Sequence, residues 1–215
     1  MVQHNMDGCL LIGGKAPDRK LLGPRIHDWD IIVAADSGLH HARNLGLVPS
    51  EIIGDFDSVE QGFVKKYPNI IIHQHERDKD ETDTELGIEL LRTRGAARIH
   101  IVGGGGGRLD HLYAILSLFH RDDPPDFWYT HREQIQLIQG KMSVRPGKNR
   151  RVSFFPLGLG PCSMKTSGLK WPLDELCWKV GDFGISNIAT HDEIKIEMKK
   201  GKLIMVYDLG NEDSV

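Results

Sequence analysis

Short runs of apolar residues recur along the first part of the chain, and most end at glycine, aspartate or histidine. The runs are continuous rather than alternating and are rich in isoleucine and valine. Strands covered on both faces have this pattern, which is typical of a parallel sheet between helices. We therefore predict strands at residues 9–12, 31–35, 51–53, 70–72, 99–102 and 127–130.

Two segments between these runs have helical periodicity. The first begins at Thr82, which forms a capping-box pattern with Glu85, and Gly95 is a suitable stop. The second covers residues 108–121 and places large apolar side chains at helical spacing, namely Leu109, Leu112, Leu116 and Phe119. Helices between strand-like runs strengthen the prediction of an α/β fold.

The pattern changes after about residue 132, where short alternating segments are separated by glycine, proline or Lys-Gly turns. The last of these, residues 193–209, has the pattern of a β-hairpin that returns after Gly201. We predict an α/β domain with a parallel sheet in residues 1–132 and a small antiparallel β-sandwich domain in residues 133–215.

Composition narrows the functional classes. The chain has 215 residues and a formal net charge of −3, which argues against a nucleic-acid surface driven by bulk charge. Its three cysteines lack C-x-x-C spacing, and the N-terminal segment has neither a basic region nor an apolar run of secretory length. No run approaches membrane-spanning length. We expect a cytoplasmic protein that binds neither nucleic acid nor membrane.

Aspartates follow several of the predicted strands. Asp36 follows the second, and Asp55 and Asp57 follow the third in the stretch IIGDFDSV. Further acids lie beyond the fourth, at Asp78, Asp80 and Asp83. Because ligands of open parallel sheets bind beyond the carboxyl ends of the strands, these acids are expected at one edge.

Each of these groups of aspartates can have a structural role or a role in binding a metal ion. Asp55 and Asp57 suit either a turn or a metal site, and the acids around Asp83 suit the solvated first turn of a helix. Taken together, Asp55, Asp57 and Asp83 can supply three oxygen ligands to Mg²⁺ and leave positions for phosphate oxygens and water. This set indicates phosphoryl-transfer chemistry.

A glycine run follows the fifth predicted strand, and Arg108 and Asp110 follow the run. Its glycines allow backbone amides to approach a phosphate, and Arg108 can neutralise one. A flexible loop without a ligand is the alternative, since neither a P-loop nor a complete G-x-G-x-x-G is present. The candidate contacts are Gly104, Gly105, Gly106 and Gly107.

Trp171 lies in the stretch SGLKWPLD of the predicted β domain. A tryptophan beside a proline is more often a core or lid residue, although an exposed ring would suit a flat aromatic or cationic ligand. The later stretch GISN contains Ser186 and Asn187.

These stretches occur in the order and approximate spacing of the thiamine pyrophosphokinase family, which the chain resembles over about residues 9–190. The resemblance rests on ADSGLHHARNLGLVPSEIIGDFDSV, RDKDETDTELGIELL, GGGGGRLDHLYAIL, SGLKWPL and GISN. It implies transfer of pyrophosphate from ATP to thiamine with Mg²⁺, by a homodimer whose active site lies in the cleft between subunits.

Residue roles follow from the same resemblance. Asp55, Asp57 and Asp83 would bind the metal. The residues that line the binding site for the nucleotide and its polyphosphate would be Asp36, Asp80, Arg108 and Asp110. Trp171 would stack on the thiamine pyrimidine from the neighbouring subunit, beside Ser186 and Asn187.

The chain departs from the family at one motif. The usual D-G-G-A-N reads D-S-G-L-H here, with Ser37 for a glycine and His40 for the asparagine. Three alternatives remain open at this point: a related hydroxymethylpterin diphosphokinase, a D-x-D metal-dependent phosphohydrolase with Asp55 as nucleophile, and a nucleotide sensor without catalysis.

Overall fold

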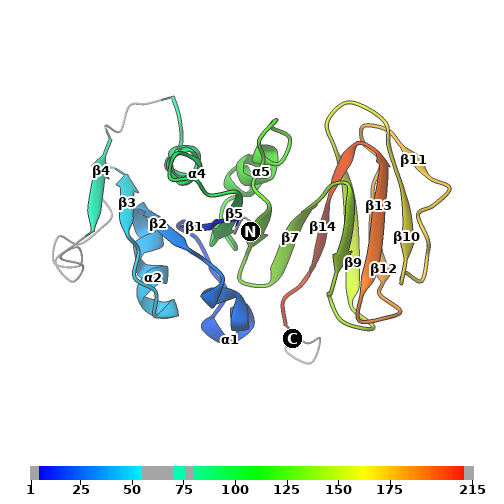
Figure 1. The fold of residues 1–215 in the computed structure, drawn as a ribbon, viewed down its shortest axis with the longest axis horizontal. Coiled ribbons are helices and arrows are strands. Elements are labelled where there is room, and N and C mark those ends of the chain that lie inside the picture. The colour runs from blue at the N-terminus through cyan, green and yellow to red at the C-terminus, as the bar shows by residue number, and fades with distance from the viewer. Residues whose placement is uncertain (1–4, 55–69, 76–79, 211–215) are drawn as a thin grey trace. The chain divides into compact units, whose positions relative to one another are not determined.

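The computed structural model describes residues 5–54, 70–75 and 80–210. The chain divides into two compact units (Figure 1). Met1–Ala114 and Pro125–His131 form the first, and Ile115–Pro124 and Arg132–Val215 form the second. In the described part, no helix combines the length and apolar character needed to cross a membrane.

The first unit contains six parallel strands in the order β6-β5-β1-β2-β3-β4. The predicted parallel sheet is therefore confirmed, with each strand within two residues of its expected bounds. The apolar runs are continuous because both faces are covered, and β1 is buried along its whole length. The strands are β1 (Asp7–Leu11), β2 (Ile31–Ala35), β3 (Glu51–Gly54), β4 (Ile71–Gln74), β5 (Arg98–Val102) and β6 (Phe127–Tyr129).

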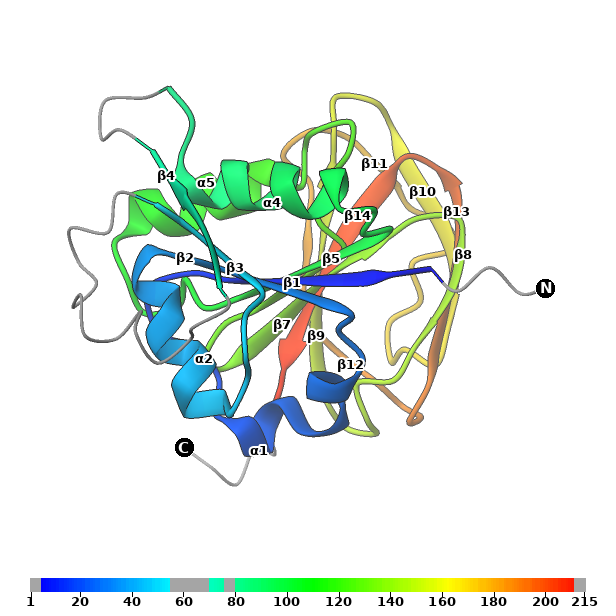
Figure 2. The same cartoon turned by 60° about the vertical axis from the view of Figure 1, so that its left-hand side comes forward.

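Helices lie on both faces of this sheet. Figure 2 shows α4 (Asp83–Thr93) above it, and α1 (Arg19–Leu22) and α2 (Leu39–Leu45) below it. Short 3₁₀ helices precede β2 and α2, at Gly23–His27 and Asp36–Gly38. The predicted capping box is present, because Thr82 accepts a hydrogen bond from the Glu85 amide while the Glu85 carboxylate accepts one from the Thr82 amide.

The second predicted helix is α5 (Leu109–Leu118), which crosses the boundary between the two units after Ala114. Of the four apolar residues expected at helical spacing, Phe119 is buried, Leu112 and Leu116 are partly buried, and Leu109 is 80% exposed. Ile115 and Leu118 are buried in addition. Helical spacing therefore identified the element and part of its packed face, but not the exposure of its first residue.

The strand order contains one reversal. The chain runs outward from β1 through β2 and β3 to β4, then returns so that β5 lies on the other side of β1. The loops after β1 and β5 consequently leave the sheet in divergent directions. Such a topological switch point is where open α/β sheets bind ligands.

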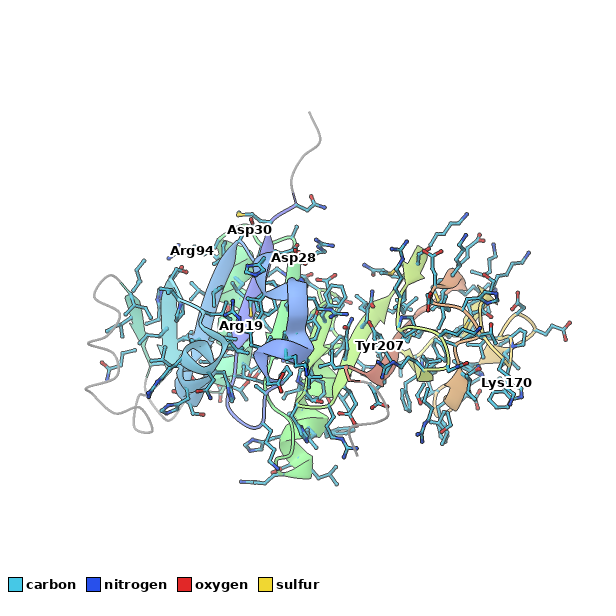
Figure 3. The ribbon with its side chains drawn as sticks, turned by 90° about the horizontal axis from the view of Figure 1, so that it is seen from below. Arg19, Asp28, Asp30, Arg94, Lys170 and Tyr207 are labelled. Carbon is cyan, nitrogen blue, oxygen red and sulfur yellow. The ribbon has the colours of Figure 1, made fainter. Side chains whose placement is uncertain are left out.

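Two ionic clusters involve residues at the amino ends of these strands. Arg98 donates two hydrogen bonds to Asp7, at 2.7 and 2.6 Å, and Asp7 is buried. Glu51 is also buried and accepts two hydrogen bonds from Arg94, at 2.7 and 2.9 Å, with the His73 Nε2 atom 2.6 Å away. Figure 3 labels Arg94 in this unit. These pairs secure strand starts, at the edge opposite the switch point.

The second unit contains two antiparallel sheets with the strand orders β12-β9-β14-β7 and β11-β10-β13-β8. One apolar core includes residues from both sheets, among them Phe154, Met164, Ile196 and Met205. This arrangement confirms the predicted β-sandwich. The strands are β7 (Glu133–Ile138), β8 (Lys141–Val144), β9 (Arg151–Leu157), β10 (Cys162–Ser167), β11 (Cys177–Trp178), β12 (Gly184–Ile188), β13 (Ile194–Lys200) and β14 (Lys202–Asp208).

The predicted hairpin after Gly201 is wrong. Strands β13 and β14 are consecutive, but β13 pairs with β10 and β8, whereas β14 pairs with β7 and β9. Gly201, at φ +72°, turns the chain from one sheet to the other, and Ile196 and Met205 join the shared core from different sheets. The sequence pattern of two successive strands joined by a Lys-Gly turn is satisfied by a sandwich corner as well as by a hairpin.

Candidate functional site

The loops after β1 and β5 are joined by backbone hydrogen bonds at the switch point. The Gly104 amide donates to the Gly13 carbonyl at 2.6 Å. Lys15 and Gly105 then exchange two bonds, of 2.7 and 2.9 Å, in an isolated antiparallel bridge. The first residues of the glycine run therefore rest on the β1 loop through backbone hydrogen bonds.

This bridge divides the amides of the glycine run into two groups. The amides of Gly103, Gly104 and Gly105 already donate to backbone carbonyls, so they are not available to a phosphate. Those of Gly106 and Gly107 have no acceptor among the described residues. Of the four glycines named from the sequence, only these two can offer an amide without a rearrangement of the loop.

Gly105 shows why the loop requires small residues. A Cβ there would lie 2.6 Å from His131 Nδ1 and 2.8 Å from the Lys15 carbonyl oxygen. Any larger residue would separate the two loops, because real Cβ atoms essentially never approach that closely. Close backbone approach, rather than contact with a ligand, accounts for this glycine.

Arg108 and Asp110 form a salt bridge at the start of α5. Arg108 donates through Nε, at 3.1 Å, and through Nη2 to the two carboxylate oxygens, and the His111 amide also donates to Asp110 at 3.0 Å. The hydrogen bond from Arg108 lowers the pKa of Asp110, and Asp110 in turn raises the pKa of Arg108. Both side chains are exposed, and Asp110 offsets the charge of Arg108 through this ion pair.

Asp36 lies between the ends of β2 and β3. Its carboxylate is against the backbone of Gly54, where any Cβ would overlap Oδ1. Asp36 also has a left-handed backbone, with φ +44°. Such conformations cost free energy in non-glycine residues and cluster at functional sites. Asp55 directly follows Gly54 in the chain, but Asp55 and Asp57 lie outside the described residues, as does Asp78.

The motif that departs from the family pattern is tightly packed. A Cβ on Gly13 would lie 2.5 Å from the Ser37 hydroxyl, so the serine fills the space above that glycine. A Cβ on Gly38 would overlap the Leu11 carbonyl oxygen at the end of β1. Ser37 is accommodated because its neighbour in the β1 loop has no side chain.

The remaining acids lie at and before the start of α4. Asp83 is the first residue of that helix and is partly exposed, and Asp80 is exposed three residues earlier. Within the described ranges, no group of three or more histidines, cysteines or acids is arranged to hold a metal ion. The donor set is nevertheless compatible with Mg²⁺ in its chemistry, because all three residues named for the metal carry carboxylate oxygens.

The three residues named in the β domain are brought together by β12. Asn187 is 5% exposed and holds the backbone of Trp171: it accepts from the Trp171 amide at 3.2 Å and donates to its carbonyl at 2.7 Å. The Trp171 ring is 51% exposed, so the interpretation of this residue as a core tryptophan is wrong. Lys170, labelled in Figure 3, places its Nζ atom 4.5 Å from the centroid of that ring.

Ser186 also has an unusual backbone. It is exposed, has φ +59° and donates its amide to the Ser153 hydroxyl at 3.2 Å. Among the described residues, three that are not glycine have positive φ: Asp36, Asn149 and Ser186. Two of the three are site residues named from the sequence, which fits the association of backbone strain with function.

Lys15 was not found from the sequence. It belongs to the stretch IGGKAP directly after β1, and its side chain crosses the glycine loop: a Cβ at Gly106 would lie 2.6 Å from Lys15 Cδ. A Gly-Gly-Lys sequence after the first apolar run was the available signal. Like the acids named from the sequence, Lys15 lies beyond the carboxyl end of its strand, four residues after Leu11.

These features define a class of protein. A doubly wound α/β unit with a glycine loop at its switch point is joined in one chain to an antiparallel β-sandwich unit that presents a half-exposed tryptophan. Residues 25–126 match the family model "Thiamin pyrophosphokinase, catalytic domain", and residues 138–203 match "Thiamin pyrophosphokinase, vitamin B1 binding domain". The chain belongs to the thiamin pyrophosphokinase family.

Curated relatives agree with this assignment. The chain is 26% identical over 182 residues to a thiamine pyrophosphokinase of Bacillus subtilis, with 81% of the chain and 85% of that protein covered. It is also 26% identical over 174 residues to thiamine pyrophosphokinase 2 of Arabidopsis thaliana, covering 69% of the chain and 61% of the longer plant protein.

Solved structures share the fold. The crystal structure of thiamine pyrophosphokinase from Bacillus subtilis matches with a TM-score of 0.76 and 24% identity, over 94% of this chain and 98% of that one. Thiamin pyrophosphokinase from Candida albicans also matches with a TM-score of 0.76, at 18% identity, over 95% and 90% of the two chains.

Proposed function

We propose that this chain transfers a pyrophosphoryl group from ATP to the hydroxyl of thiamine, which yields thiamine diphosphate and AMP. The observation that carries the proposal is that one chain contains both family domains in order, the catalytic model over residues 25–126 and the vitamin B1 binding model over residues 138–203. A hydrolase or a sensor would need no vitamin-binding domain.

The acceptor hydroxyl attacks the β-phosphorus of ATP in line with the bond that breaks. A new oxygen–phosphorus bond forms, the bond from the β-phosphorus to the oxygen bridging it to the α-phosphate breaks, and AMP leaves. The hydroxyl proton passes to a carboxylate of the site, for which Asp36, Asp80 and Asp110 are the candidates. Positioning and charge stabilisation supply most of the catalysis in such a transfer.

Asp55, Asp57 and Asp83 would hold Mg²⁺ in this proposal. The ion would neutralise the phosphate oxygens and so stabilise charge that develops during transfer. Asp36 and Asp80 would line the nucleotide site, together with the loop Gly104, Gly105, Gly106 and Gly107. Arg108 would exchange its salt bridge with Asp110 for a contact with a phosphate.

The β-sandwich domain would bind thiamine. Trp171 offers a flat ring to the pyrimidine, and Asn187 holds the tryptophan backbone in place. Ser186 lies one residue from Asn187 on β12 and would contribute to the same site. Lys170 lies against the ring, so thiamine must use the other face or displace the lysine.

The domain roles and the assembly complete the proposal. Residues 1–132 would form the ATP-binding catalytic domain and residues 133–215 the thiamine-binding domain. The enzyme would act in the cytoplasm as a homodimer, with the active site in the cleft between subunits.

The first test is to incubate the purified protein with ATP, Mg²⁺ and thiamine and to identify the products. We expect AMP and thiamine diphosphate in equal amounts. ADP or free phosphate would instead indicate a monophosphoryl kinase or a hydrolase. A protein active only with a hydroxymethylpterin acceptor would refute the assignment of thiamine.

Substitution of the D-x-D pair tests the role of the metal ligands. Asp55→Asn and Asp57→Asn should each abolish turnover while circular dichroism and thermal unfolding remain those of the wild type. Turnover near the wild-type rate in either variant would rule out the metal assignment. Loss of turnover with loss of folding would require the same test with Asp83→Asn.

A further inference from the structure

The switch point of the first unit contains a cationic residue, Lys15, that was not among the site residues named from the sequence. Lys15 is delivered there by the loop that follows β1, and the glycine loop is delivered by β5 on the other side of the reversal in strand order. Ligands of doubly wound sheets bind between two such loops. The strand order alone therefore places Lys15 at the switch point.

Backbone contacts fix the start of the Lys15 side chain. The Lys15 amide and carbonyl both bond to Gly105, at 2.7 and 2.9 Å, so its Cα has a fixed position on the glycine loop. The side chain then runs across Gly106, where a Cβ would lie 2.6, 3.1 and 3.2 Å from Lys15 Cδ, Cγ and Cε. The stem thus follows the part of the loop whose amides are available.

The distribution of charge distinguishes Lys15 from Arg108. Arg108 is already paired with Asp110 two residues away. Lys15 is exposed, and it has no acidic partner among the described residues. Gly106 and Gly107 likewise have amides without an acceptor in the described part. An ammonium beside two amides, none of which has a partner in the described part of the chain, is an arrangement that recognises phosphate oxygens.

We infer that Lys15 binds the phosphates of the nucleotide substrate, acting with the amides of Gly106 and Gly107 as a second cationic contact besides Arg108. The inference rests on the proposed function, because it assumes a nucleotide at this edge of the sheet. Lys15 would bind the chain of phosphates in preference to the nucleoside, since its ammonium charge is attracted to the negatively charged phosphate oxygens and the nucleoside carries no charge.

The test compares ligands with and without phosphates. Binding of α,β-methylene-ATP, in which the bond that would break is blocked, and of adenosine is measured by calorimetry for the wild type and for Lys15→Met. Methionine keeps an unbranched stem over Gly106 and removes the charge. Lys15→Arg keeps the charge, and Lys20→Met removes an exposed lysine from the same unit as a matched control.

We expect Lys15→Met to weaken binding of the analogue about 10- to 100-fold, the effect of losing one charge-assisted contact, and to leave adenosine binding unchanged. Lys15→Arg should stay within about 3-fold of the wild type, and Lys20→Met should match it. Unchanged affinity of Lys15→Met for the analogue would overturn the inference. Equal loss for the analogue and adenosine would also overturn it, because that result indicates a structural role.

The outcome is separable from that of the proposed function. A wild-type protein that binds the analogue through Lys15 but forms no thiamine diphosphate would refute the function and leave the lysine contact intact. A wild-type protein that forms the product while Lys15→Met binds the analogue normally would refute only the lysine contact. Failure of the wild type to bind the analogue would overturn the inference.

Discussion

Asn187→Leu tests whether the Trp171 ring depends on a buried amide for its position. The Asn187 side chain makes three hydrogen bonds: with the Trp171 amide at 3.2 Å, with the Trp171 carbonyl at 2.7 Å and with the Ile188 amide at 2.8 Å. Leucine has a similar volume, so the substitution removes the bonds without creating a large cavity.

The expected loss of stability follows from these bonds. Each contributes about 1 kcal/mol net, which gives about 3 kcal/mol if no other partner replaces them. Because Trp171 is 51% exposed, water can satisfy part of its backbone. We therefore expect the free energy of unfolding to fall by about 1–3 kcal/mol in urea titrations.

The kinetic effect should be confined to thiamine. An aromatic stacking contact contributes about 0.5–1.5 kcal/mol beyond the buried area, so a displaced ring should raise the KM for thiamine about 2- to 10-fold. The KM for ATP should not change. Trp171→Ala is the matched variant: it should raise the same KM, and because about half of the residue is buried it should also lower stability, by about 2–3 kcal/mol.

Two results would refute this reasoning. If Asn187→Leu unfolds at the wild-type urea concentration, the three bonds do not stabilise the native state. If it is destabilised but has the wild-type KM for thiamine, the amide stabilises the domain and does not position the ring.

Three further predictions concern other parts of the molecule. Arg94→Met should lower the free energy of unfolding at pH 7, because it leaves the buried Glu51 carboxylate without its main partner. The hydrogen bonds from Arg94 lower the pKa of Glu51. The stability that this pair contributes is therefore complete above about pH 4.3, the pKa of an unfolded glutamate, and is lost as the pH falls through the lower native pKa. If the free energies of unfolding of Arg94→Met and the wild type differ by the same amount at pH 7 and pH 3 in urea titrations, this reasoning is contradicted. Gly38→Ala should cost at least about 2 kcal/mol in thermal unfolding, because its Cβ would overlap the Leu11 carbonyl, whereas Gly160→Ala, with nothing within 4 Å, should be near neutral. Lys170→Met should lower the KM for thiamine about 2- to 5-fold by removing a cation from the Trp171 ring, and a raised KM would show that Lys170 assists binding.

Much of the first unit could be predicted because each strand end carries its own local signal. The run IIVAA is buried at its end, and Asp36 follows it directly, so the order of strand and acid can be read without knowing which strands are neighbours. The capping box at Thr82 was equally local, and its two hydrogen bonds formed as expected.

Features that depend on distant partners were not predictable in the same way. The amide of Gly104 is unavailable to a ligand because it bonds to Gly13, and nothing in a glycine run specifies that partner. The prediction that β13 and β14 form a hairpin failed for a similar reason. An alternating sequence pattern indicates which side chains are buried but not which strand is adjacent, and the two strands pair within different sheets. The backbone of Trp171 likewise bonds to a distant partner, Asn187, 16 residues further along the chain.

The position of β14 has a consequence for how the second unit forms. This strand lies between β7 and β9, which precede it in the chain, and each of them pairs with β14 and not with the other. On a ribosome, residues 133–157 therefore emerge well before their shared partner at residues 202–208, and two strand edges stay open meanwhile. We expect folding of this unit to be slow and dominated by long-range pairing, and a nascent chain arrested before residue 202 to depend on chaperones.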